Sequence, residues 1–247
     1  EIRLETREKA QDQFMPFVHH VYDGFIEGRH HRIIAEKLER IAKGELKRLI
    51  VNMPPRHSKS EFASYLMPAW FLGRNPKLKI IQATHNTELA VRFGRKVRDL
   101  MGSDIYRDIF TNTHLKSDDK AAGRWGTAEG GEYFAAGVGA AVTGRGADLF
   151  IIDDPHSEQD ALSETAFDHA YEWYTSGPRQ RLQPGGAIIV VMTRWGTKDL
   201  TGRLLKAQGD DRMSDEWEVV EFPAIMPSDE PLWPEFWNKD DLLKVKA

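Results

Sequence analysis

The stretch LIVNMPPRHSKS, residues 49–60, joins a short apolar run to a segment that is compatible with a helix. A strand that feeds a helix through a tight loop aims backbone N–H groups and the positive end of the helix dipole at one point. An anion is stabilised there, and a lysine in the loop adds a positive charge for the outer phosphates of a nucleotide. The stretch therefore predicts a phosphate-binding loop between a strand and a helix.

The end of this loop fits the pattern G-x-x-x-x-G-K-[ST], in which the lysine reaches the outer phosphates and the hydroxyl reaches Mg²⁺. Lys59 and Ser60 occupy these two positions, whereas Met53 and Ser58 stand where the pattern has glycines. A Lys-Ser pair after a strand also occurs in ordinary surface loops, so the prediction depends on further motifs. The residues expected to bind the nucleotide ATP are Arg56, His57, Ser58, Lys59, Ser60 and Glu61, with Ser60 also a ligand of Mg²⁺.

The composition describes a chain of 247 residues with a formal net charge of −4, a pI near 6.2 and no cysteine. This length suits one large α/β domain. The absence of cysteine excludes a disulfide framework, a thiolate metal site and a cysteine nucleophile. The acidic balance argues against a protein that coats nucleic acid with its whole surface, so any contact with DNA is expected to be local. No apolar run approaches the roughly 20 residues of a membrane-spanning helix. A soluble cytoplasmic protein is expected.

Short apolar runs alternate with helix-compatible segments along most of the chain. Strands are expected at residues 49–53, 79–83, 149–152, 187–192 and 217–222, and helices at 60–72, 88–101 and 161–175, with two helices within residues 1–47. This alternation predicts βαβ units and a mostly parallel sheet. Residues 84–87 are expected to cap the helix that follows them. Residues 111–146, rich in Gly, Ala and Thr, predict short strands or a hairpin with a flexible loop.

Two carboxylates, Asp153 and Asp154, close the apolar strand 149–152 at its C-terminal end. In phosphoryl transfer, one strand-end carboxylate orients the shell of a magnesium ion and a neighbouring carboxylate can polarise the attacking water. We therefore expect Asp153 to serve the metal and Asp154 to serve the water. Taken alone, an Asp-Asp-Pro turn could equally cap a strand. A phosphate loop upstream in the same α/β pattern favours the catalytic interpretation.

A third motif, TRWG at residues 193–196, follows the apolar strand 187–192. Ligands of open parallel sheets bind outside the carboxyl ends of the strands, so Thr193 can reach a γ-phosphate or its water and act as a sensor. The alternative is an ordinary strand end with Arg194 in a surface ion pair.

A fourth motif, the glycine-flanked loop TGRGAD at residues 143–148, presents one arginine. An arginine beside a γ-phosphate stabilises charge in the transition state, and it can come from the same subunit or from a neighbour. Arg145 is the preferred candidate for such an arginine finger. The alternative is a solvated loop arginine beside Asp148, and Arg56 is a separate candidate for contacting phosphates.

Together, these motifs resemble the large terminase subunit of tailed bacteriophages and prophages. The resemblance rests on PPRHSKSE at residues 54–61, TGRGAD leading into IIDDP at 151–155, and TRW at 193–195, in consistent order over essentially the whole chain. It implies the N-terminal ATPase half of that subunit, with a RecA-like α/β P-loop fold of the additional-strand, catalytic-glutamate class. The family's phosphate loop, acidic strand and coupling motif fall on Lys59, on Asp153 with Asp154, and on Thr193. A trans-acting arginine finger falls on Arg145.

Two departures from the family pattern stand out. Ser58 replaces the glycine common before the lysine, so its Cβ must be accommodated where the backbone approaches phosphate. Asp154 replaces the usual catalytic glutamate and is one methylene shorter, which could shift the water or pass the role to Glu158. Slow or weak nucleotide binding is compatible with both departures.

The resemblance also implies a function, partners and a domain layout. It implies an ATP-driven motor that moves double-stranded viral DNA into a procapsid, working with a portal protein and a small terminase subunit. The active form is expected to be a homo-oligomeric ring at the portal vertex in the host cytoplasm, without a membrane partner, and the isolated fragment a monomer. Residues 1–222 are expected to form the ATPase domain, and residues 223–247 an arm toward a nuclease domain found only in the full-length protein.

Contacts with DNA and with adenine are less clear from the sequence. Several cations share one predicted helix, namely Arg92, Arg95, Lys96 and Arg98. They form either a phosphate-contacting face or a solvated one. An adenine pocket could use Phe17, Tyr22 or His31, although aromatic residues there also suit simple packing.

Two other functions remain open at this point. A helicase-like or remodelling ATPase would share the phosphate loop and the acidic strand but carry a second RecA-like lobe. A nucleotide-binding scaffold without hydrolysis is suggested by Ser58 and Asp154.

Overall fold

The sheet at the centre of the molecule consists mostly of parallel strands. The computed structural model describes residues 2–142, 144–210 and 212–246. The strands are β1 (Arg48–Asn52), β2 (Lys79–Thr84), β3 (Leu115–Ala121), β4 (Arg124–Thr127), β5 (Glu132–Gly137), β6 (Ala147–Asp153), β7 (Leu182–Met192) and β8 (Glu218–Glu221). Within the described ranges they form one eight-stranded sheet in the order β3-β4-β5-β2-β6-β7-β1-β8. Neighbours from β5 to β8 pair in parallel, and β3 and β4 add an antiparallel edge.

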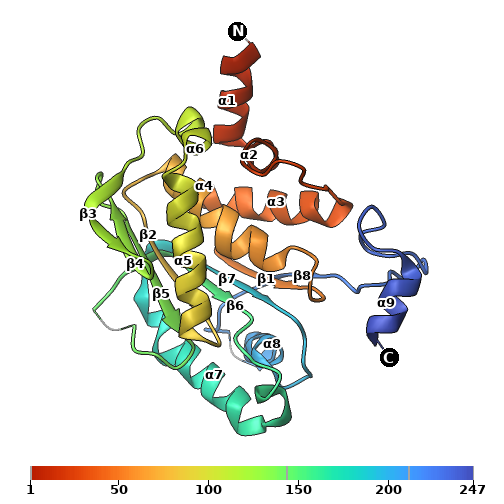
Figure 1. The fold of residues 1–247 in the computed structure, drawn as a ribbon. Coiled ribbons are helices and arrows are strands. Elements are labelled where there is room, and N and C mark those ends of the chain that lie inside the picture. Colours follow the sequence, from red (N-terminus) through yellow and green to blue (C-terminus); the bar gives the residue numbers. More distant parts are fainter. Residues whose placement is uncertain (1, 143, 211, 247) are drawn as a thin grey trace.

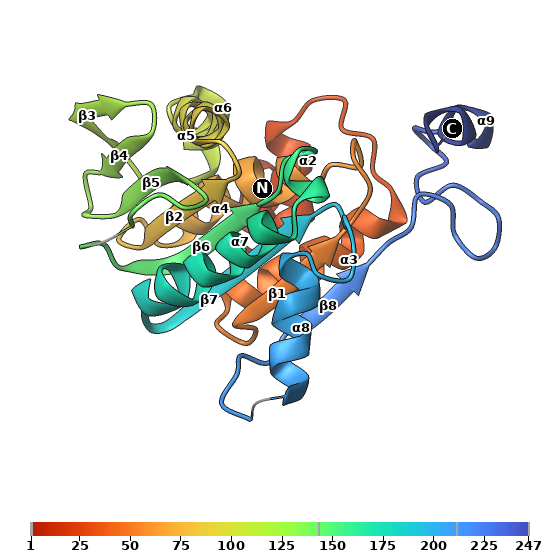
Figure 2. The same cartoon turned by 90° about the horizontal axis from the view of Figure 1, so that it is seen from below.

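Helices cover both faces of this sheet (Figure 1). The α-helices are α1 (Ile2–Asp12), α2 (Phe14–Val21), α3 (Arg29–Ala42), α4 (Met67–Arg74), α5 (Thr87–Met101), α6 (Asp104–Ile109), α7 (Glu164–Ser176), α8 (Leu200–Asp210) and α9 (Lys239–Lys246). A π-helical turn, η1 (Glu61–Leu66), precedes α4, and two 3₁₀ turns, η2 (Asp160–Leu162) and η3 (Pro178–Arg181), flank α7. Helices α2 to α6 pack on one face and α7 and α8 on the other, as the view in Figure 2 also shows.

The central strands are mostly apolar because both of their faces are buried. In β6, Leu149 and Ile151 pack under the helices of one face, while Phe150 and Ile152 pack under α7 and α8. The same alternation holds in β1, where Ile50 faces the α7 side. The mixed α/β fold with a mostly parallel sheet flanked by helices, expected from the sequence, is therefore confirmed.

The N-terminal region differs from the expectation of two helices, because residues 2–42 form three. The break lies at Gln13, whose backbone is extended between α1 and α2. Pro16 lies within the first turn of α2, and its ring would clash with the carbonyl of residue 12 if α1 continued through it. A proline in the first helical turn is tolerated, so the chain ends one helix and starts another.

Other boundaries follow the local signals or depart from them for identifiable reasons. Helix α5 begins as expected, because the Asn86 side chain accepts the N–H of Glu88 at 2.7 Å. Helix α8 and the short helix α6 were not expected, since each follows a polar stretch without a long apolar period. The arm from residue 223 contains helix α9 near its end rather than being extended throughout, and it packs on the domain through the buried side chains of Leu232 and Trp233. No helix in the described ranges is long and apolar enough to cross a bilayer.

Candidate active site

The C-terminal ends of four parallel strands meet at one edge of the sheet. Thr84 of β2 pairs with Asp153 of β6, Asp153 pairs with Val191 of β7, and Asn52 of β1 pairs with Met192 of β7. The residues that follow these strand ends therefore lie side by side. This is the place where open parallel sheets bind their ligands.

The loop after β1 has the backbone shape of an anion cradle. Arg56 and Ser58 adopt positive φ angles of 60° and 71°. Alternation of left- and right-handed residues turns successive N–H groups inward, and the helical turn that begins at Lys59 adds its own free N–H groups. Ser58 thus occupies the left-handed conformation for which the sequence pattern has glycine. The missing glycine is accommodated by strain at one residue rather than by a different loop.

This strain leads to a stability prediction for Ser58. Ser58→Gly is expected to leave the free energy of unfolding within about 1 kcal/mol of the original, because relief of strain is offset by added freedom in the unfolded chain. Ser58→Val is expected to lower it by about 2 kcal/mol or more, because a β-branched residue is an outlier at positive φ. Denaturant unfolding measures both. Ser58→Ala, which keeps the Cβ, separates the effect of the hydroxyl, and equal stability of the Gly and Val variants would contradict the left-handed conformation.

The loop and the acidic strand are joined by two direct contacts. The Lys59 ammonium lies 2.8 Å from Asp154 Oδ2. The Ser60 hydroxyl donates to Asp153 Oδ1 at 2.9 Å. Residues that are 93 positions apart in sequence thus form one cluster of charge and hydroxyl groups. The contacts join Lys59 and Ser60 to the two carboxylates predicted for the water and the metal.

Asp153 is the most deeply buried of these groups, with 2% of its surface exposed. Burial, and then the neighbouring charge of Asp154, raise the pKa of Asp153 to about 6. Hydrogen bonds from Ser64, at 2.6 Å, and from Ser60 act in the opposite direction by stabilising the carboxylate, as does the charge of Lys59. A buried carboxylate without full compensation is costly, and this is characteristic of a site built to hold a cation.

Asp154 is held in an uncommon backbone conformation with φ at 42°. Its N–H donates to the Val191 carbonyl at 2.8 Å, and its Oδ1 accepts the N–H of Thr193 at 2.9 Å. Since Oδ2 contacts Lys59, both carboxylate oxygens have partners within the chain. The side chain is aimed across the strand ends toward the phosphate loop.

Thr193 and Arg194, the first two residues of the motif after β7, make different contacts. Thr193 lies at the strand edge, where its N–H binds Asp154 and its hydroxyl donates to the Met53 carbonyl at 3.4 Å. Arg194 instead turns to the carboxylate of Asp199, with its Nε 2.9 Å from Oδ2, and to Glu221 at 3.4 Å. Asp199 is fully buried and also accepts the N–H of Gly202 at 2.9 Å, so it fixes the turn into α8.

Three residues predicted for the site lie elsewhere or face away. Arg145 stacks on Phe134, 4.1 Å from the ring centre, and lies 3.8 Å from Glu132. It precedes β6, whose seven residues separate it from the Asp153 end by roughly 20 Å. Glu61 pairs with Lys96 at 2.6 Å. The buried ring of His57 contacts the Pro55 carbonyl and stacks on Trp237. Thr143, at the start of the Arg145 loop, lies outside the described residues.

An open groove of about 650 Å³ runs along this edge of the sheet. It is lined by Pro55, Lys59, His85, Asn86, Asp154, His156, Ser157, Glu158, Gln159, Thr193 and Trp195. Glu158 is exposed there and could approach a ligand of Asp154. The groove therefore joins the phosphate loop to the proposed water-activating groups.

Comparison with solved structures identifies the architecture. The ATPase domain of the large terminase of Thermus phage P74-26 superposes with a TM-score of 0.57 at 11% identity, over 95% of this chain and 92% of that chain. This chain has the fold of a large-terminase ATPase domain. The large terminases of bacteriophage HK97 and of a thermophilic bacteriophage, the latter in complex with ADP, give TM-scores of 0.48 at 14% and 10% identity. They cover 84% and 85% of this chain, which spans 44% and 49% of theirs. No protein-family model and no curated protein matches the chain.

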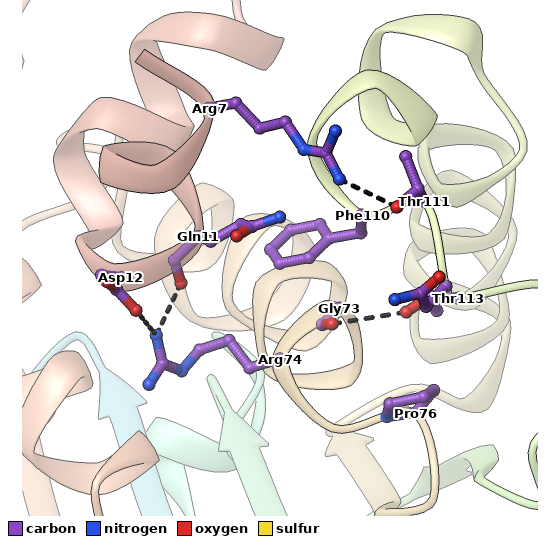
Figure 3. Close-up of a pocket in the computed structure, with 10 residues that line it drawn as sticks. Arg7, Gln11, Asp12, Gly73, Arg74, Pro76, Phe110, Thr111 and Thr113 are labelled. Carbon is purple, nitrogen blue, oxygen red and sulfur yellow. Dashed lines mark hydrogen bonds and ion pairs between the residues drawn. The ribbon is translucent and has the colours of Figure 1, made fainter. Parts of the chain in front are cut away.

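This terminase-type fold also contains a second cavity, of about 450 Å³, lined by α1, the end of α4 and the segment after α6 (Figure 3). Arg7 donates to Thr111 at 2.8 Å, and Arg74 donates to the Gln11 carbonyl at 2.6 Å, so both guanidinium groups already have partners. None of the residues predicted for the site lines this cavity. This cavity is smaller than the groove beside Lys59 and Asp154, and it contains none of the chemistry predicted for the site.

The candidates for adenine and DNA contact are spread over different environments of the terminase-type domain. Phe17 is fully buried in the core, and His31 is buried beside Phe62, whereas Tyr22 is 41% exposed. Among the cations of α5, Arg92 and Arg95 are exposed, while Lys96 lies over the Tyr65 ring. Packing in the core accounts for Phe17. The exposed side chains of Arg92 and Arg95 on α5 are accessible to a partner.

Sequence reasoning missed several residues of the site. Ser64 lies one helical turn after Ser60 and joins it on Asp153, and the four-residue spacing was a signal for this. Asp199 fixes the turn between Thr193 and α8. It lies directly before α8 and accepts the Gly202 N–H, as the N-cap residue of a helix does. His85 and His156 reach the groove from the ends of β2 and β6, which the strand-edge rule used for Asp153 could have indicated.

Proposed function

We propose that this chain is the ATP-hydrolysing motor domain of a DNA-packaging terminase. One observation carries the proposal: Lys59 and Ser60 of the phosphate loop contact Asp154 and Asp153 at the carboxyl edge of one parallel sheet. Each of these residue types has a defined task in phosphoryl transfer. The terminase ATPase fold supports the choice of motor among the ATPases that share such an edge.

The residues present fit magnesium and a nucleotide. Magnesium prefers hard oxygen ligands and is commonly bound by one or two carboxylates together with phosphates and water. Ser60 and Asp153 offer a hydroxyl and a buried carboxylate in contact, and the described ranges hold no group of three or more His, Cys, Asp or Glu suited to a metal ion. When bound, Mg²⁺ neutralises charge on the phosphate oxygens. The nest at Arg56 and Ser58, with the N–H groups that follow, would hold those phosphates.

The ion pair between Lys59 and Asp154 connects binding to chemistry. A phosphate in the loop competes with Asp154 for the Lys59 ammonium. As Lys59 turns to the phosphate, Asp154 Oδ2 becomes free to accept a proton from the attacking water. Thr193 keeps Oδ1 in place through its N–H. Glu158, exposed in the same groove, is the alternative base, because Asp154 is one methylene shorter than a glutamate.

Arg145 fits a finger that acts on a neighbouring subunit. In its own chain it lies at the far end of β6, so it cannot reach the phosphates bound beside Asp153. A ring of identical subunits can bring this end of one subunit to the groove of the next. Arg145 is therefore proposed to supply positive charge in trans, as fingers do in other phosphoryl-transfer enzymes.

The remaining assignments concern the assembly. We propose double-stranded viral DNA as the moving substrate, with the exposed cations of α5 as a local contact for its phosphates. A portal protein on a procapsid, a small terminase subunit and a nuclease domain of the full-length protein complete the proposed machine, which acts in the host cytoplasm.

A packaging assay with the full-length protein tests the motor and the finger together. Protein, procapsids, ATP and DNA are combined, and DNA protected from added nuclease is measured beside phosphate release. Wild-type protein is expected to protect DNA. Arg145→Ala mixed with wild type in rising proportion is expected to reduce turnover more steeply than dilution alone, because each variant subunit disables its neighbour's site. Arg107→Ala, which removes an exposed arginine that none of the proposed roles uses, serves as the control.

The outcomes separate the two claims. If the protein binds ATP but shows no DNA-stimulated phosphate release, it is a nucleotide-binding scaffold and the motor proposal is wrong. If wild-type protein packages DNA but turnover falls only linearly with the proportion of Arg145→Ala protein, the motor proposal stands. In that case only the assignment of Arg145 as a finger is wrong.

A further inference from the structure

His85 contacts the residue on which water activation depends. It follows β2 directly and lines the groove beside Lys59 and Asp154. Its backbone N–H lies 3.2 Å from the carbonyl oxygen of Asp154, and its ring Nδ1 lies 3.0 Å from the same oxygen. A carbonyl oxygen only accepts hydrogen bonds, so Nδ1 carries the proton and donates. Two donors from one residue thus hold a single carbonyl.

The Asp154 backbone needs such support. A non-glycine residue with φ at 42° is strained, and the conformation persists only where the surroundings over-determine it. The N–H of Asp154 is held by Val191, and its carboxylate is held by Thr193 and Lys59. Within the described ranges, both hydrogen bonds recorded to the Asp154 carbonyl come from His85.

The proposed function makes one of the side-chain contacts temporary. In that proposal, Lys59 leaves Asp154 when a phosphate enters the loop. At that moment the carboxylate loses a partner while its direction matters most, since a general base must lie within hydrogen-bond reach of the proton that it takes. The contact from His85 acts on the backbone and does not depend on Lys59, so it persists through the exchange.

We propose that His85 is a positioning residue, which fixes the backbone of Asp154 and so keeps its carboxylate aimed at the attacking water. This inference rests on the proposed ATPase function. His85 acts through Asp154 and does not itself exchange the proton.

The chemistry of the imidazole allows a matched set of variants. The amide nitrogen of asparagine is attached at the same position as Nδ1, whereas that of glutamine corresponds to Nε2. His85→Asn therefore keeps a donor for the Asp154 carbonyl, His85→Gln moves it, and His85→Ala removes it. All three keep the backbone N–H bond. His114→Ala, an exposed histidine paired with Glu129, serves as the control.

Steady-state ATP turnover by the full-length protein with DNA gives the first readout. His85→Ala and His85→Gln are expected to lower kcat by about tenfold, the factor that one oriented hydrogen bond supplies, with KM for ATP changed less than about threefold. His85→Asn is expected to stay within about threefold of wild type. Equal losses in all three variants, or a loss carried by KM alone, would overturn the positioning role.

Crystal structures of the variants give a readout that does not need turnover. In His85→Ala, residue 154 is expected to leave the left-handed region and to lose its bond from Thr193, whereas in His85→Asn it keeps both. Retention of φ near 42° in His85→Ala would refute the inference even for an inactive protein. If wild-type protein fails to hydrolyse ATP while the variants shift Asp154 as expected, the proposed function fails and the structural role of His85 stands.

Discussion

Replacing Asp153 with asparagine is expected to abolish ATP turnover and at the same time to stabilise the metal-free fold above about pH 6. The amide keeps the size of the side chain but removes the charge that would hold Mg²⁺, so turnover should fall by about 100-fold or more, as for loss of a preorganised charge contact. Stability should rise because a buried carboxylate is replaced by a neutral group.

The pH dependence follows from the raised pKa of Asp153, about 6 in the folded chain. In the unfolded chain an aspartate titrates near a pKa of about 4. Between about pH 4 and pH 6 the folded protein holds a proton that the unfolded chain has lost, so the contribution of Asp153 to the free energy of unfolding falls as the pH rises through this window. Above about pH 6 the loss is complete and amounts to about 3 kcal/mol in order of magnitude. Asp153→Asn removes this loss.

Denaturant unfolding of the metal-free protein at about pH 5 and about pH 7.5, beside phosphate release at the higher pH, measures both effects. Asp148→Asn is the matched control, because Asp148 lies on the same strand but binds the Lys79 N–H at the opposite edge. Its variant should keep turnover. An Asp153→Asn protein that is less stable than the original at the higher pH would contradict the unfavourable burial, and retained turnover would contradict the metal role.

Lys59→Ala is expected to reduce ATP turnover by about 100- to 1,000-fold, the range found when one charge-stabilising donor is removed from an active site. The side chain is only 7% exposed and contacts Asp154, so its charge is held at a fixed position beside the acidic strand. Its loss also removes a charge that lowers the pKa of Asp153, so that pKa should rise further. Nucleotide affinity, measured by titration with a non-hydrolysable ATP analogue, should fall together with kcat.

Lys9→Ala provides the comparison for this variant, because Lys9 forms only an exposed helical pair with Glu5. Such a pair is screened by solvent and contributes little to stability, and its loss should leave turnover unchanged. Normal hydrolysis by a correctly folded Lys59→Ala protein would end the proposal that this chain is an ATPase with its centre at the phosphate loop.

The strand ends were the predictable part of the site. Lys59, Asp153 and Thr193 each follow an apolar run, and parallel strands that share a sheet place their carboxyl ends together. The order of these apolar runs, and the expectation that such runs form buried strands, were sufficient for that inference. The same reasoning gave the sheet and most of its helices, because the periodicity of apolar residues is a local signal.

The missed features depend on contacts between distant segments. Asp199 acquires its role only when Arg194 folds back onto it and α8 begins beside it. The position of Arg145 at the far edge follows from its place before β6, but its stacking on Phe134 required the pairing of β5 with β2. The extra break in the N-terminal helices could have been found, since Pro16 is visible in the sequence.

The arm after residue 222 changes which part of the chain is the smallest unit that keeps the loop after β1 supported. Trp237 stacks on His57 and donates its ring N–H to the Arg56 carbonyl at 3.4 Å, so a segment 181 positions away braces the loop that carries two strained residues. Rigid support of this kind lowers the entropic cost of ordering a ligand. Cutting the chain at residue 222 would therefore remove both contacts that Trp237 makes with the loop between β1 and η1. Conversely, a displacement of the arm is expected to move that loop as well, because the two Trp237 contacts connect them.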